Sequence, residues 1–314
     1  MIEALRRKPK VLACVLGPLF VMGALGLWVL NASRIGPLES CLSDCATVGE
    51  AGRDTLRVMD LNVLHGFPRF KALSQRLDLI AHEIQRQDAD LVCLQEAPWT
   101  LRLGSAARRL AKQTGMNYVY LPVNGNRKAI FFSEGEAILS RFPLKEVVYI
   151  ELQPRAGFFE QRVALKATAI TPWGLVNVIS THLTTAGGEV NRSQAQTLKE
   201  YVASQSPQIT LIAGDFNARE DSAQILDLSR EWVDTYRLAN PDSPGSTCCV
   251  EDLGSSGGES LQKRIDYLFI QPGEPANFRV VSSRVILNQP FRSGAGWQWA
   301  SDHAGLLTEL RLLP

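Results

Sequence analysis

The sequence has almost no excess charge of either sign, no internal repeat and few histidines. Its 314 residues carry a formal net charge of +1, and the first ten residues contribute +3 of it. The remainder therefore carries a formal charge of about −2, so it has no excess of positive charge with which to bind a polyanion. Nothing between residues 55 and 314 resembles a domain linker, so one large domain is expected there.

Residues 1–30 differ in composition from the rest of the chain. A basic segment, 1–10, precedes twenty residues, 11–30, that contain no charged side chain. At 1.5 Å per residue this run is about long enough to cross the roughly 30 Å core of a bilayer. The basic cluster favours a cytoplasmic N-terminus, so we expect a membrane anchor with the rest of the chain outside the cytoplasm. A cleaved signal peptide is the alternative, because Ala32 and Ser33 offer small residues at which it could be cut.

The cysteines are consistent with export. Cys41 and Cys45 lie four residues apart in a segment, 31–54, that reads as a linker, and Cys248 and Cys249 are adjacent in a loop. In an oxidising compartment two disulfides are expected among these four, with the connectivity left open. A zinc site is the alternative, although no histidine has the matching spacing. Cys93 lies in an apolar run and is expected in the core.

Strand-like and helix-like patterns alternate from residue 55 to the C-terminus, which predicts an α/β domain over 55–314. Helical spacing of apolar residues predicts helices over 71–86, 101–112 and 191–204. The segments 163–170 and 175–180 are expected to form a hairpin. Apolar runs predict strands over 56–63, 91–94, 118–123, 129–132, 137–139, 146–152, 163–170, 175–180, 209–213, 264–270, 279–287 and 305–310.

Polar side chains stand at the ends of these strands. Asp215 and Asn217 follow a buried strand and are two residues apart, so in extended backbone they point the same way. Alone they would read as a turn that bonds its own backbone. Carboxylates and imidazoles gathered in this way suit phosphoester hydrolysis, in which a base activates water and a hard cation such as Mg²⁺ takes oxygen ligands. The other strand-end residues are Asn62, Glu96, His182, Asp266, Asp302 and His303.

Six short strings follow one another along the chain: Leu94-Gln95-Glu96, Ala137-Ile138-Leu139-Ser140-Arg141, Ser180-Thr181-His182-Leu183, Gly214-Asp215-Phe216-Asn217, Arg264-Ile265-Asp266-Tyr267 and Ser301-Asp302-His303. With these strings in this order, the sequence over about residues 56–310 resembles the endonuclease/exonuclease/phosphatase superfamily, which includes deoxyribonucleases, abasic-site endonucleases, sphingomyelinases and inositol phosphatases. The resemblance implies a four-layered α/β sandwich, with two mixed β-sheets face to face and helices outside.

The resemblance also implies a role for each matching residue. Glu96 would hold Mg²⁺, for which Mn²⁺ could substitute, with Asn62 and Asp302 near the metal or the phosphate. Asp215 would orient or deprotonate the attacking water, and Asn217 would bind a phosphoryl oxygen. The expected catalytic residues are thus His182, Asp215, Asn217, Asp266 and His303, with Asp266 orienting His303, and the expected substrate contacts are Asn62 and Arg162.

Some positions leave alternatives open. Glu136 takes the place of an Asn that is frequent in the family, and it is either a partner of His182 or a tolerated surface acid. Arg162 resembles a phosphate-contacting Arg, although an exposed Arg at a strand start is the plainer interpretation. His65 could line the pocket or belong to a local turn, and His82 is expected on an exposed helix face.

The leading functional hypothesis is a membrane-tethered or secreted, Mg²⁺-dependent phosphodiesterase. A phospholipid-type or other small phosphodiester is favoured as substrate, a nuclease acting on DNA or RNA is the alternative, and a non-catalytic membrane-bound binding module is the third possibility. Trp297 and Trp299 precede the Ser301-Asp302-His303 string, and Phe158 and Phe159 precede Arg162. Aromatic residues there can stack on bases, enter a bilayer surface or pack the loops.

Overall fold

The computed structural model describes residues 17–26, 34–49, 52, 54–205, 208–257, 261–273, 278–294 and 296–312. Half of the expected anchor, 11–16 and 27–30, lies outside the described residues, and 17–26 form an exposed helix. Within the described ranges, no helix is both long enough and apolar enough to span a bilayer. The membrane anchor therefore stays a prediction.

The larger sheet mixes parallel and antiparallel strands and is built from the first half of the domain together with its C-terminal strands. Its order is β1–β5–β6–β3–β2–β16–β13, with β4 paired to β3. The neighbours β2 and β3 run parallel, whereas β16 runs antiparallel to β2. The strands are β1 (Glu39–Cys41), β2 (Leu56–Asn62), β3 (Leu91–Thr100), β4 (Gly104–Ser105), β5 (Asn117–Asn126), β6 (Phe132–Ser140), β13 (Phe278–Ile286) and β16 (Gly305–Leu312).

The second sheet is built from the middle of the chain, in the order β11–β12–β10–β9–β8–β7. The expected hairpin is confirmed, since β8 and β9 pair antiparallel. The central strand β10 runs parallel to β9 and antiparallel to β12. The strands are β7 (Leu144–Glu151), β8 (Val163–Thr171), β9 (Gly174–His182), β10 (Thr210–Asp215), β11 (Val233–Asp234) and β12 (Asp266–Gln271).

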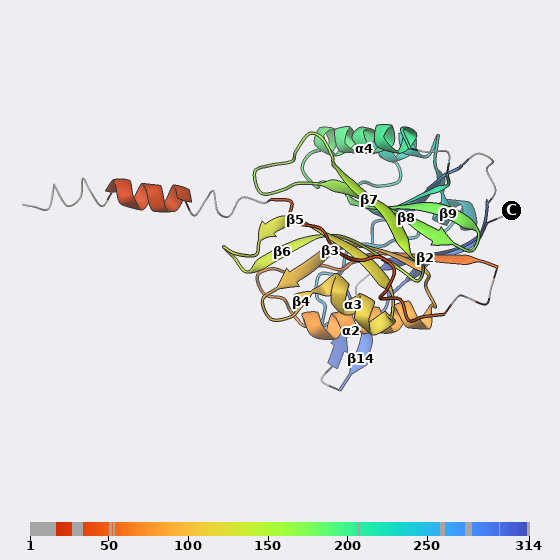
Figure 1. Ribbon diagram of the computed structural model, residues 1–314, viewed down its shortest axis with the longest axis horizontal. Helices are drawn as coiled ribbons and strands as arrows, with labels where there is room; N and C mark the ends of the chain where they lie inside the picture. Colours follow the sequence, from red (N-terminus) through yellow and green to blue (C-terminus); the bar gives the residue numbers. More distant parts are fainter. Residues whose placement is uncertain are drawn as a thin grey trace, which may run out of the picture.

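Three apolar clusters hold these elements in four layers. One cluster lies between the sheets and joins residues of β2 and β3, such as Leu56 and Cys93, to residues of β10 and β12, such as Leu211 and Leu268. A second packs α2 (Leu73–Arg86) and α3 (Ala106–Thr114) on the larger sheet. The third packs α4 (Gly188–Ala203) and α5 (Ala223–Leu228) on the smaller one. Figure 1 shows the result, with α2 and α3 on one outer side and α4 on the other.

The expected α/β sandwich is therefore observed, and the differences from the expected elements are local. Residues 129–131 form a turn rather than a strand, and β6 begins only at Phe132. The helix expected over 101–112 begins at Ala106, where Ser105 caps it by accepting a hydrogen bond from the Arg108 amide. Seven short elements were not expected from the apolar pattern: β1, β4, α5, β11, α6 (Thr235–Ala239), and the hairpin of β14 (Phe291–Ser293) and β15 (Gly296–Gln298).

Part of the expected linker, 31–54, is folded onto the domain. Strand β1 pairs with β5, and the amides of Cys45 and Ala46 donate to the Asn117 side chain. The structure pairs Cys41 with Cys45 and Cys248 with Cys249, so both disulfides link the nearest available cysteines. Cys93 is a buried free thiol in the core, as its apolar surroundings in the sequence indicate.

Candidate active site

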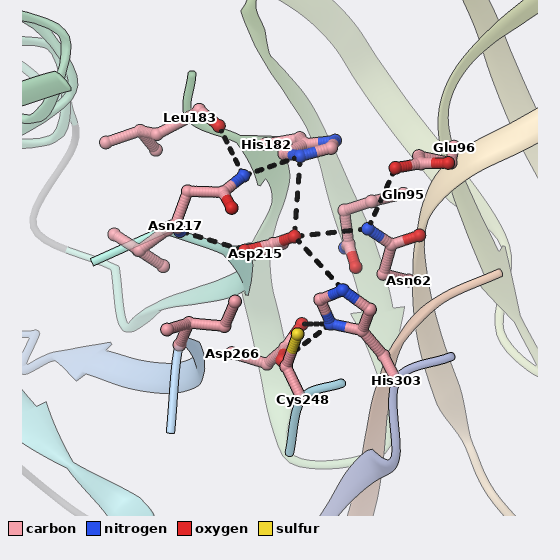
Figure 2. A network of polar contacts seen from close by, with 12 residues as sticks. Asn62, Gln95, Glu96, His182, Leu183, Asp215, Asn217, Cys248, Asp266 and His303 are labelled. Carbon is pink, nitrogen blue, oxygen red and sulfur yellow. Dashed lines mark hydrogen bonds and ion pairs between the residues drawn. The ribbon is translucent and has the colours of Figure 1, made fainter. Parts of the chain in front are cut away.

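The pairing of β9, β10 and β12 brings three polar strand ends together. Asp215, the last residue of β10, is the register partner of His182 on one side and of Asp266 on the other. The larger sheet supplies Asn62 at the end of β2 and His303 just before β16, which runs antiparallel to β2. Because the two sheets are packed face to face, their polar ends meet in one network (Figure 2).

Asp215 lies at the centre of this network and is almost fully buried. Its Oδ2 accepts a hydrogen bond from Asn62 Nδ2 at 3.1 Å and lies 3.4 Å from His182 Nε2 and 3.8 Å from His303 Nε2. Its Oδ1 accepts the backbone N–H of Asn217 at 2.8 Å. Burial, assisted by the negative charge of Asp266, raises the pKa of Asp215 to about 7. A carboxylate with this pKa is suited to take a proton from water near neutral pH.

His303 and Asp266 form a buried ion pair. The imidazole Nδ1 lies 2.9 and 3.0 Å from the two oxygens of Asp266, which assigns Nδ1–H as the donor and leaves Nε2 facing Asp215. Burial opposes the charge of His303, but Asp266 and then Asp215 outweigh it and hold the pKa of the imidazole well above its usual value. His303 therefore presents a charged Nε2–H to the centre of the site.

His182 has the opposite character. Its Nε2 lies 2.9 Å from Asn217 Nδ2, and that amide nitrogen also donates to the Leu183 carbonyl oxygen at 2.9 Å. Because the carbonyl can only accept, it determines the orientation of the amide, so Nε2 accepts and the ring proton lies on Nδ1. Burial first, and then the positive charges of Arg162 and His303, lower the pKa of His182 well below its usual value, so the ring is neutral.

The Nδ1–H of His182 is buried, and no described residue accepts it. A buried donor without a partner is costly unless an acceptor arrives. This N–H is therefore available for an oxygen of a bound substrate. Asn217, by contrast, donates its two amide hydrogens to His182 Nε2 and to the Leu183 carbonyl oxygen, so in this structure it positions the imidazole. Its expected contact with a phosphoryl oxygen stays a prediction.

The expected metal ligands form a separate, oxygen-rich group beside this network. Glu96 lies at an irregularity of β3 with a positive φ of 53°, which turns its side chain toward the site. Its Oε1 accepts from Asn62 Nδ2 at 3.2 Å and its Oε2 from the His65 amide at 3.1 Å. Asp302 is close enough that Glu96 adds to the effect of burial in raising the pKa of Asp302. Two neighbouring carboxylates with neutral donors fit a hard cation such as Mg²⁺ or Mn²⁺.

Two supporting residues were missed from the sequence. Arg76 of α2 is fully buried and donates to the carbonyl oxygens of Val63, Leu64 and Ala300 at 2.7, 2.8 and 3.2 Å, joining the backbone that follows Asn62 to the backbone that precedes Asp302. The sequence feature that could have identified Arg76 is the position of an arginine on the apolar face of a helix, next to Leu73 and Leu77. Thr247 donates to Asp266 Oδ2 at 2.5 Å from a distant loop that carries no recognisable motif.

The open alternatives at four further positions can now be assigned. His65 meets both of its alternatives, because its Nε2 lies 3.5 Å from Glu96 Oε2 and its Nδ1 accepts the Phe67 amide at 2.9 Å in a local turn. His82 is exposed, as expected. Glu136 is not a surface acid: it is buried and accepts from Ser180 Oγ at 2.7 Å, and this serine rather than His182 is its hydrogen-bond partner. Arg162 is not exposed either, because it is largely covered and pairs with Glu160 at 2.9 Å.

The aromatic residues that precede Arg162 and the Ser301-Asp302-His303 string in the sequence divide into two groups. Trp299 is 2% exposed, donates to Ser255 Oγ and packs on Val250 and Leu253, so it packs a loop. Trp297 on the β14–β15 hairpin is 40% exposed, and Figure 1 shows β14 projecting beyond α2. Phe158 and Phe159, in the loop before β8, are also exposed and contact each other edge to face.

The site residues lie within a stretch that matches one known family. The sequence profile described as the Endonuclease/Exonuclease/phosphatase family matches residues 61–303. The chain belongs to this family. No curated protein sequence matches the chain. The family is one of hydrolytic phosphatases and nucleases, so the fold and the general class of chemistry expected from the six strings are confirmed.

Solved structures of the endonuclease/exonuclease/phosphatase family share the fold. A family protein from Beutenbergia cavernae has 25% sequence identity and a TM-score of 0.62, over 83% of this chain and 72% of its own. A mannosyl-6-phosphatase from Bacteroides thetaiotaomicron has 20% identity and a TM-score of 0.63, over 81% and 99%. Truncated TDP2 from Caenorhabditis elegans has 19% identity and a TM-score of 0.61, over 82% and 97%. The last two likenesses show the fold alone.

Proposed function

We propose that this chain is a Mg²⁺- or Mn²⁺-dependent phosphodiesterase that hydrolyses its substrate by in-line attack of an activated water. The observation that carries the proposal is that one buried network contains both a carboxylate able to accept a proton and a charged imidazole able to donate a hydrogen bond. Asp215, with a pKa of about 7, is a base, whereas His303, held charged by Asp266, is a hydrogen-bond donor. Groups whose environments separate their pKa values in this way are suited to divide acid and base roles.

Each residue then has a task defined by the atom that it presents to the site. Asp215 takes the proton of the attacking water through Oδ2, and His303 donates Nε2–H to a phosphoryl oxygen. His182 donates its unpartnered Nδ1–H to a second phosphoryl oxygen, with Asn217 holding the ring in place. Glu96 and Asp302 would hold the cation, with Asn62 beside them, and the cation when bound would polarise the phosphoryl group.

The substrate we favour is a phospholipid-type or other small phosphodiester, rather than DNA or RNA. A long nucleic acid is held through several phosphates, and a chain that carries about −2 beyond its first ten residues offers little general attraction for it. The exposed aromatic side chains Phe158, Phe159 and Trp297 suit an apolar surface. A membrane anchor formed by residues 11–30, with the domain outside the cytoplasm, would keep the site near a membrane.

The test is turnover of a substrate panel by the full chain: mixed phospholipid vesicles, a chromogenic phosphodiester, a phosphomonoester and plasmid DNA. We expect diester hydrolysis that a chelator abolishes and Mg²⁺ restores. His303→Ala should lower kcat at least about 100-fold, and His82→Ala, on the exposed face of α2, is the matched control. Full activity after chelation would overturn the metal assignment, and plasmid cleavage with intact vesicles would favour the nuclease. No turnover of any substrate would favour the binding module.

The localisation has its own test. A reporter that is active only in the cytoplasm should stay silent when fused after Pro314, and the full chain should sediment with membranes. A freely soluble mature protein that begins near Ser33 would instead identify a cleaved signal peptide.

A further inference from the structure

The adjacent cysteines Cys248 and Cys249 lie beside the His303–Asp266 pair, although Cys249 and His303 are 54 positions apart in the sequence. Cys248 forms isolated β-bridges with both Lys263 and His303, so its strand-like segment runs between the backbones that carry Asp266 and His303. The Ala304 amide donates to the Thr247 carbonyl at 2.7 Å, and the Val250 amide donates to the Asp302 carbonyl at 2.8 Å. Figure 2 shows the Cys248 sulfur next to this buried pair.

The three side chains have the composition and spacing of a metal site. One ligand atom from each of Cys248, Cys249 and His303 lies within 4.8 Å of the others. Two sulfurs and an imidazole nitrogen are soft donors, which select Zn²⁺ or Co²⁺ over the Mg²⁺ that suits Glu96 and Asp302. In the disulfide the sulfurs are not thiolates, and only a thiolate is an effective ligand.

We propose that Cys248, Cys249 and His303 form a binding site for a thiophilic divalent cation such as Zn²⁺, which becomes available when the disulfide is reduced and withdraws His303 from the phosphate. The cation would take three protein ligands and one water, the usual count for a four-coordinate zinc site. The binding does not depend on the proposed phosphodiesterase activity, whereas the resulting inhibition rests on it.

The two sulfurs of the Cys248–Cys249 disulfide differ in burial, and this difference determines which of them a reductant can reach. Cys249 is exposed, whereas Cys248 is fully buried. A trialkylphosphine can therefore attack the Cys249 sulfur, so that the S–S bond breaks and its electron pair leaves on the Cys248 sulfur, which takes a proton. Water then converts the phosphorus to a phosphine oxide and releases the Cys249 thiol. The two thiols, and the His303 ring nitrogen that becomes the third ligand, lose their protons when the cation binds.

The experiment is a Co²⁺ titration of the full chain, before and after reduction with a trialkylphosphine that is then removed without air. The reduced protein should show thiolate-to-cobalt charge-transfer absorption in the near ultraviolet, and the oxidised protein should not. Cys248→Ser with Cys249→Ser should abolish the signal, whereas Cys41→Ser with Cys45→Ser, which removes the other disulfide, should retain it. His303→Gln should weaken Co²⁺ binding at least about tenfold.

Several results would overturn the proposal: no absorption in the reduced chain, an equal signal in the Cys248/Cys249 double variant, or unchanged affinity in His303→Gln. If the double variant does not fold, Cys249→Ser alone alters only the exposed partner and should still weaken binding at least about tenfold. In the activity arm, Zn²⁺ should inhibit the reduced chain at a concentration at least about tenfold lower than the oxidised chain in excess Mg²⁺. Equal inhibition of the reduced and oxidised chains by Zn²⁺ would refute the withdrawal of His303 from the phosphate. If the chain has no phosphodiesterase activity, the Co²⁺ titration alone decides whether the cation site exists.

Discussion

The role of Asp266 can be tested by Asp266→Asn, which keeps the shape of the side chain and removes its charge. Both oxygens of Asp266 lie within 3.0 Å of His303 Nδ1, and both side chains are buried. A hydrogen bond to a charged group contributes about 1.5–3 kcal/mol. Since about 1.4 kcal/mol corresponds to a tenfold change in rate, kcat/KM should fall about 10- to 100-fold if this interaction is needed in the transition state.

The same substitution should move the whole pH profile of kcat/KM. Activity should rise with pH as Asp215 loses its proton near pH 7 and fall at higher pH as His303 loses its own. The charge of Asp266 raises the pKa of both groups. Its removal should therefore shift the rising limb and the falling limb to lower pH together. A residue that only supported the fold would lower the rate and leave both limbs in place.

The assay is kcat/KM for a chromogenic phosphodiester at saturating Mg²⁺ across the pH range, with Asp221→Asn as the matched control. Asp221 is 84% exposed and lies far along the chain from the His303 pair, so its variant should keep the wild-type profile. An Asp266→Asn enzyme with unchanged limbs, or with a falling limb displaced to higher pH, would refute the assignment of His303 as the charged donor.

Three further substitutions test the surroundings of the site. Arg76→Met should lower the free energy of unfolding by at least about 3 kcal/mol, measured by urea denaturation, because it leaves buried carbonyl oxygens without donors. Thr247→Val removes the donor to Asp266 Oδ2 and should lower kcat about tenfold while circular dichroism stays unchanged. Glu136→Gln should raise the melting temperature more at about pH 8 than at about pH 4. Burial raises the pKa of Glu136, so the folded state retains its proton and loses stability as pH rises above the unfolded pKa; an equal gain at both pH values would contradict this.

Much of the fold was accessible from the sequence because the strands that form the site have continuous apolar runs. The strands ending at Asn62, His182 and Asp215 were expected, and so was the polar residue at each end. The apolar pattern failed where local geometry, rather than periodicity, determines structure. Residues 129–131 are apolar or aromatic but form a turn, with Phe131 exposed and at positive φ.

The candidate site was predicted as a set of residues but not as a geometry. The register that places Asp215 opposite both His182 and Asp266 depends on the packing of whole strands, which no short string encodes. The resemblance implies that Asn217 binds a phosphoryl oxygen, which stays a prediction, whereas its contacts with the Leu183 carbonyl and His182 were not expected from the sequence. Contacts between distant loops, such as Cys248 beside His303, had no local signal at all.

Asn62 connects the two functional parts of the site. Its single amide nitrogen donates to Glu96 Oε1 at 3.2 Å and to Asp215 Oδ2 at 3.1 Å, so it lies between the oxygen-rich group and the acid–base network. Glu96 belongs to the larger sheet and Asp215 to the smaller one. The distance between the group suited to a cation and the group suited to activate water is therefore set by the packing of one sheet on the other. This explains why both halves of the domain are needed to build one site, and why the apolar cluster between the sheets matters to the geometry of the proposed reaction.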